Sequence, residues 1–68
     1  MTNEQNTETK PADPALGLRA VLALRRLAER VEAEQVARAR EQGWSWQQIA
    51  EVLGMTRQSV HAKYGAAL

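Results

Sequence analysis

No recognisable catalytic or metal-binding motif occurs in this sequence of 68 residues. Cysteine is absent and His61 is the only histidine, so neither a thiol nucleophile nor a cysteine–histidine zinc site can form. The glycines stand singly, and no glycine-rich loop is available to hold a phosphate group. We therefore expect no enzymatic activity, no bound metal ion and no small-molecule cofactor.

The charge is modestly positive and unevenly distributed. The whole chain carries +1, whereas residues 15–68 keep eight basic and five acidic side chains, which amounts to +3. The sequence pI of about 8.3 lies below the value of about 9 that is typical of strongly basic nucleic-acid-binding domains. The composition therefore permits binding to DNA without requiring it.

The first 13 residues are predicted to form a disordered polar tail. Met1 and Ala12 are the only hydrophobic residues before Pro14, and so polar a segment buries too little surface to offset the entropy lost on ordering. Residues 14–68 remain, enough for a single small domain. No apolar run approaches the roughly 18 residues of a membrane span, and the N-terminus lacks the features of a signal peptide. We expect a cytoplasmic protein without membrane contact.

A long helix is predicted over residues 14–42. Asp13 is a favourable N-cap, and Pro14 suits the first helical position because its missing N–H would have no partner there. The segment is rich in Ala, Leu, Arg and Glu, which are strong helix formers. Gly43 can end the helix in the left-handed conformation.

This predicted helix has two apolar faces, because Ala33, Val36 and Ala39 lie almost opposite the apolar residues of its N-terminal half. A bent helix that packs within one monomer is one explanation, and a helix that serves two cores is the other. We favour the second, since two short downstream helices can hardly cover so much apolar surface. We expect a homodimer, in parallel or antiparallel orientation, through a stripe that comprises Leu16, Ala20, Leu24, Leu27 and Val31.

Two short helices with capping signals are predicted over residues 46–53 and 57–64. Ser45 and Gln48 form a capping box for the first helix, and Thr56 caps the second. Gly54 and Gly65 are suited to end them. No segment has the pattern of a strand, so the sequence predicts an all-α fold. Two hydrophobic pairs are spaced to staple the helix starts: Trp44 with Ile49, and Met55 with Val60.

The segment GWSWQQIAEVLGMTRQSVHAKYG, residues 43–65, resembles the helix-turn-helix of bacterial transcriptional regulators of the homeodomain-like or sigma-factor region 4 kind. It fits the pattern G-x-S-x-x-x-I-A-x-x-L-G-x-[ST]-x-x-[SA]-V at every position. Lys63 departs from the family, which often has an apolar residue there, and Tyr64 can supply the missing packing. Residues 66–68 leave no room for a β-wing, so the resemblance implies a long N-terminal helix followed by a wingless, tri-helical helix-turn-helix.

The resemblance also implies which residues contact DNA, because the last helix of this family enters the major groove. Arg57 and Gln58 at its first turn, with His61 one turn on, are the expected base contacts, since Arg can bridge guanine O6 and N7 and Gln adenine N6 and N7. The alternative is that they are solvated surface residues. Expected phosphate contacts, near helix N-termini or within reach of the backbone, are Ser45, Gln47, Thr56, Ser59, Lys63 and Tyr64.

We therefore expect a homodimeric, nucleoid-associated protein that binds double-stranded DNA sequence-specifically and regulates transcription. A different class of protein also fits the sequence, namely a small helical adaptor that binds another protein through its Leu-rich helix. Ionic strength distinguishes the two, since DNA affinity falls steeply with salt whereas an apolar protein interface is much less sensitive.

Overall fold

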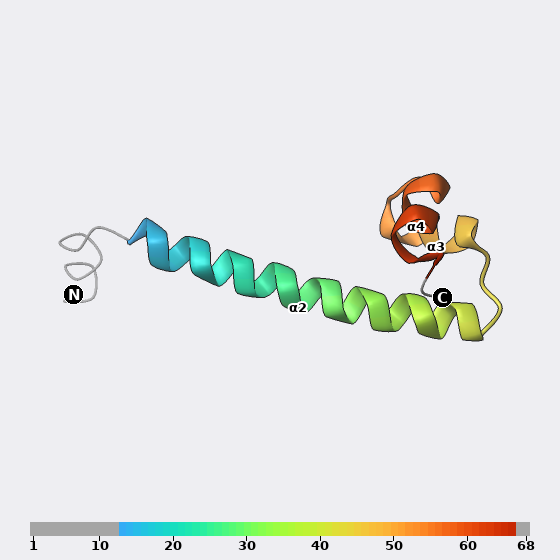
Figure 1. Ribbon diagram of the computed structural model, residues 1–68, viewed down its shortest axis with the longest axis horizontal. Helices are drawn as coiled ribbons and strands as arrows, with labels where there is room; N and C mark the ends of the chain where they lie inside the picture. Colours follow the sequence, from blue (N-terminus) through green and yellow to red (C-terminus); the bar gives the residue numbers. More distant parts are fainter. Residues whose placement is uncertain (1–12, 67–68) are drawn as a thin grey trace, which may run out of the picture.

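The computed structural model describes residues 13–66, which form three α-helices: α2 (Pro14–Glu41), α3 (Trp46–Leu53) and α4 (Arg57–Tyr64). No strand is present in that range, so the predicted all-α architecture is confirmed. Figure 1 shows α2 as one unbroken rod, with α3 and α4 folded together beside its C-terminal end. Apart from Asp13, the predicted tail lies outside the described residues.

The two ends of α2 follow from its capping residues. The carboxylate of Asp13 accepts a hydrogen bond from the Ala15 amide at 3.0 Å, and a proline occupies the first turn. The helix ends at Glu41, one residue earlier than predicted, with Gln42 as its C-cap. Gly43 then adopts a φ of 89°, and the Trp44 amide donates to the carbonyl of Ala39 at 3.0 Å. This Schellman turn reverses the chain.

The starts of α3 and α4 are capped as predicted. Ser45 and Gln48 make both hydrogen bonds of the capping box, at 2.8 and 3.1 Å. The Thr56 hydroxyl accepts a hydrogen bond from the Ser59 amide at 3.0 Å. Between the helices, Gly54 has a φ of 71°, and the Met55 amide donates to the Ala50 carbonyl at 2.9 Å. The tight turn of a helix-turn-helix is thereby formed.

The hydrophobic core lies where the C-terminal half of α2 meets α3 and α4. Val60 of α4 is fully buried, and Ala50 of α3 is 1% exposed, which lets the helices cross closely. Tyr64 is also buried and supplies the packing that Lys63 cannot, as predicted. The complete core consists of Val36, Ile49, Ala50, Val60 and Tyr64, with Ala39, Trp46, Leu53 and Met55 packed around it.

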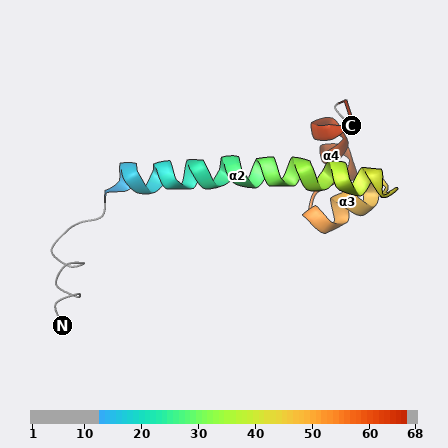
Figure 2. The ribbon, with the colours of Figure 1, turned by 90° about the horizontal axis from the view of Figure 1, so that it is seen from below.

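The N-terminal half of α2 projects away from this core. Figures 1 and 2, seen from perpendicular directions, both show it extending beyond α3 and α4. The 28 residues of α2 span about 42 Å at about 1.5 Å per residue, and the core uses only the last few turns. The predicted stripe remains exposed in this single chain, for example 63% at Leu16 and 64% at Leu24. No helix within residues 13–66 is long and apolar enough to cross a membrane.

Candidate functional site

The outer face of α4 carries the residues expected to read DNA. Val60 and Tyr64 are buried against the rest of the fold, so the opposite side of this short helix faces solvent. Arg57, Gln58 and His61 are all exposed. By the helical repeat, Gln58 and Ala62 lie opposite this buried side, whereas Arg57 and His61 form an exposed row along its edge.

The side chains of Arg57 and Gln58 are available to a ligand. Neither makes a side-chain hydrogen bond to another residue in the described part of the chain. A guanidinium and a carboxamide can each form two parallel hydrogen bonds with one planar partner. Adjacent at the first turn of α4, they form a pair of unoccupied hydrogen-bonding groups.

His61 occupies a more constrained position than the sequence suggested. Its ring meets the edge of Trp46 in a T-shaped contact, with centroids 5.5 Å apart and planes at 87°. The guanidinium of Arg40 lies 4.4 Å from the centroid of the same indole and donates to the Trp44 carbonyl at 2.7 Å. Trp46 therefore links all three helices, and it orients the imidazole of His61.

The predicted phosphate ligands near helix starts serve first as caps. Ser45 and Thr56 each accept a backbone amide hydrogen bond, and the Thr56 hydroxyl donates to Ser59 Oγ at 2.8 Å. Gln47 donates to Glu51 at 3.3 Å. The hydroxyl oxygens of Ser45 and Ser59 only accept in these contacts, so the hydroxyl groups of both serines remain free to donate a hydrogen bond. These two serines retain the donors that a phosphate oxygen needs.

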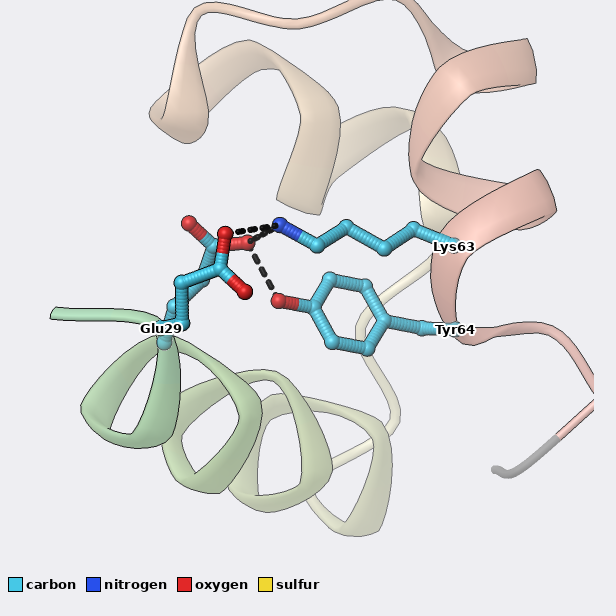
Figure 3. A network of polar contacts seen from close by, with 4 residues as sticks. Glu29, Lys63 and Tyr64 are labelled. Carbon is cyan, nitrogen blue, oxygen red and sulfur yellow. Dashed lines mark hydrogen bonds and ion pairs between the residues drawn. The ribbon is translucent and has the colours of Figure 1, made fainter. Parts of the chain in front are cut away.

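Lys63 and Tyr64, also predicted as phosphate ligands, have partners inside the chain. Figure 3 shows both side chains reaching from α4 toward carboxylates on α2. The ammonium of Lys63 lies 3.1 Å from a carboxylate oxygen of Glu32 and 3.6 Å from one of Glu29. The Tyr64 hydroxyl donates to the same oxygen of Glu32. Both side chains thus fix α4 on α2.

This contact shifts the protonation equilibria of its members. The hydrogen bond from Tyr64 has the largest effect on the Glu32 carboxyl and lowers its pKa; burial opposes this shift, and the hydrogen bond and charge of Lys63 lower the pKa further. Burial, and next the hydrogen bond to Glu32, raises the pKa of the Tyr64 hydroxyl. The hydrogen bond to Glu32 raises the pKa of the Lys63 ammonium. All three shifts favour an ionised Glu32 beside a protonated Lys63 and a protonated Tyr64 at neutral pH.

Three residues of this site were not predicted from the sequence. One, Ala62, is exposed on α4, and the other two, Arg40 and Glu32, lie on α2 and help to hold α4 in place. Ala62 lies four positions after Gln58 and is exposed, but alanine has no hydrogen-bonding group to attract notice. The helical repeat of α4 was the signal that could have found it. Arg40 and Glu32 act across helices, and their spacing from α4 in sequence gives no signal. Within residues 13–66, no group of three or more potential metal ligands occurs.

Comparison with known proteins places this geometry in a family. The sequence model of the homeodomain-like domain matches residues 24–64, a range that spans most of α2 and all of α3 and α4. No curated protein and no solved structure matches the chain significantly. The family match supports DNA binding by the helix-turn-helix. This chain belongs to the homeodomain-like domain family.

Proposed function

We propose that the protein binds double-stranded DNA sequence-specifically by inserting α4 into the major groove, and that it regulates transcription. The observation that carries this proposal is the exposed surface of α4, where the side chains of Arg57 and Gln58 are exposed and make no side-chain hydrogen bond within the described residues, while Val60 and Tyr64 hold the helix on the core. An α-helix fits the B-DNA major groove, and these side chains match the acceptors and donors of guanine and adenine. His61 and Ala62 extend the same surface.

The roles along this surface follow from chemistry. Arg57 suits a guanine, Gln58 an adenine, and the methyl group of Ala62 suits the methyl group of thymine. Ser45 and Ser59, with Gln47 and Thr56 beside them, suit phosphate oxygens at the starts of α3 and α4. Lys63 and Tyr64 act mainly by holding α4 on α2, because both already bind Glu32.

The test is selection of duplexes from a randomised library by the full chain, followed by titration of the selected and a scrambled duplex at several salt concentrations. We expect an enriched motif, with a two-fold repeat if the protein binds as a dimer, and an affinity that falls steeply with salt. Equal binding of both duplexes would contradict sequence-specific recognition. Absence of binding to either would contradict DNA binding itself.

One observation favours a second candidate function, that of a protein–protein adaptor. Leu16, Leu18 and Leu24 are all more than 60% exposed, and apolar surface of this extent is typical of interaction sites. An adaptor would bind its partner with little dependence on salt, and substitutions at Arg57 and Gln58 would leave that binding unchanged.

A further inference from the structure

An open apolar groove of about 500 Å³ runs between α2 and α3. The C-terminal half of α2 forms one wall, and Trp44, Val52 and Leu53 form the other. Val52 is 73% exposed, so most of its side chain is left uncovered by the rest of the described residues. Within the described chain no segment covers this groove, so its apolar walls face solvent.

The groove is continuous with the predicted stripe. Val31 belongs to both, because it is a stripe residue and also lines the groove. Ala28, one turn before it, lines the groove as well. The stripe residues upstream, from Leu16 to Leu27, lie on the same side of α2 as Val31 by the helical repeat. One uninterrupted apolar surface therefore runs along α2 from its first turn into the groove beside α3.

The charges of α2 favour one orientation of a second copy. Residues 14–30 carry four arginines and one glutamate, whereas residues 31–42 carry three glutamates and two arginines. A parallel pair would place the basic halves side by side. An antiparallel pair would place each basic half beside the more acidic half of its partner, which is the favourable arrangement.

The spacing of these charges also selects a register. Arg19 and Arg26 are seven residues apart, as are Glu34 and Glu41. If Arg19 lies opposite the glutamate at 41 of an antiparallel copy, then Arg26 lies opposite the glutamate at 34, and the two-fold axis passes near Arg30. In this register Leu16 to Leu24 of one copy lie along positions 44 to 36 of the other, beside the groove.

We propose that the occupant of the groove is the N-terminal half of α2 from a second copy of this chain, bound in antiparallel orientation about a two-fold axis near Arg30. Such an interface is isologous, so each copy fills the groove of the other and no further copy can add. It covers the exposed stripe and the exposed groove walls with the same contact. The proposal deepens the homodimer expected for the DNA-binding function and rests on that expectation.

The first experiment measures oligomeric state by sedimentation without DNA, at tens of micromolar, so that its result is independent of whether DNA is bound. We expect a dimer for the wild type and monomers for Val52→Glu, because a charge would be buried in the occupied groove. The side chain is mostly exposed in the single chain, so the substitution leaves the fold intact. Ala33→Glu is the control, since Ala33 is exposed on α2 away from the stripe, and it should remain dimeric.

The second experiment determines orientation with single cysteines, which are unambiguous because the chain has none of its own. Arg30→Cys should cross-link to its own copy through a bis-maleimide that spans the ~10 Å between packed helices. Arg19→Cys should not, because the two positions would lie about 33 Å apart along antiparallel helices at about 1.5 Å per residue. A parallel dimer would cross-link at both positions.

Three results would overturn the proposal. A monomeric wild type would leave the groove to a different protein, and a dimer that survives Val52→Glu would show that the groove is empty in the assembly. Cross-linking of Arg19→Cys as efficient as that of Arg30→Cys would establish the parallel arrangement. Each result leaves the DNA-binding proposal to be judged by its own titrations.

Discussion

The hydroxyl of Tyr64 on α4 donates a hydrogen bond to the carboxylate of Glu32 on α2, across 32 positions of the chain. The donor comes from a buried side chain and the acceptor is ionised, so the bond belongs to the stronger class of protein hydrogen bonds. It joins the helix proposed to read DNA to the helix proposed to form the dimer.

Removal of this hydroxyl should destabilise the fold without a loss of packing. Tyr64→Phe keeps the buried ring and removes the donor, so we expect a loss of about 1–2 kcal/mol in the free energy of unfolding, measured by urea denaturation. Glu29→Gln is the matched control, because Glu29 is more exposed and lies 3.6 Å from Lys63; it should change stability by less than about 0.5 kcal/mol. Equal losses in both variants would contradict a special role for the hydroxyl.

The same contact predicts how stability depends on pH. The pKa of Glu32 is lowered from its ordinary value of 4.5. Its contribution to the free energy of unfolding is therefore present above that value and is lost as the pH falls through the folded-state pKa. The pKa values of Lys63 and Tyr64 are raised from 10.5 and 10.0, so their contributions are present below these values and are lost at higher pH.

The urea midpoint should therefore be highest between about pH 5 and 10 and fall on either side. Glu32→Gln should lower the plateau and flatten the acid limb, whereas Glu34→Gln, at an exposed position of the same helix, should leave the acid limb as it is. An acid limb unchanged by Glu32→Gln would show that other carboxyl groups cause it.

Two glycines should respond to alanine in opposite directions. Gly54 has a φ of 71°, and a Cβ there would meet no atom within 4 Å, so Gly54→Ala should cost about 1–2 kcal/mol from backbone strain alone. Gly17 lies within α2, also with open space around it, so Gly17→Ala should stabilise the helix by about 0.5–1 kcal/mol. Thermal unfolding followed by circular dichroism measures both. A neutral Gly54→Ala would show that the turn relaxes.

DNA titrations should separate base contacts from phosphate contacts. Arg57→Ala should cost about 1–3 kcal/mol on the selected duplex and relax selectivity at one base pair per half-site, and Gln58→Ala should act similarly at a neighbouring base pair.

Lys63→Ala tests the phosphate role predicted for Lys63: a true phosphate contact would lower affinity equally on both duplexes and reduce the salt slope by about one. If Lys63 serves only Glu32, the salt slope stays unchanged. An equal loss on both duplexes with Arg57→Ala would mark Arg57 as a phosphate ligand.

Local signals were sufficient to predict the helix-turn-helix from the sequence. Ser45, Thr56 and Gly54 act within a few residues of themselves, so the bounds of α3 and α4 follow from short-range chemistry. The contacts of Glu32 with Tyr64 and of Trp46 with His61 could not be predicted, because they depend on how α2 is rotated and tilted over the other helices. The pairing stripe stays a prediction, since a partner chain determines whether it is buried.

Because α2 is one uninterrupted helix, its length fixes both the distance and the angle between the stripe and the core. Each residue added to an α-helix advances it by about 1.5 Å and rotates it by about 100°, so a single insertion between the stripe and the core would turn one apolar surface away from the other. An insertion of seven residues would restore the phase to within about 20°, and in the proposed dimer it would move the two copies of α4 farther apart by a fixed distance. If the proposed dimer is correct, variants of this chain with α2 lengthened by whole heptads should still pair, and the two half-sites that they select should lie farther apart by matching steps.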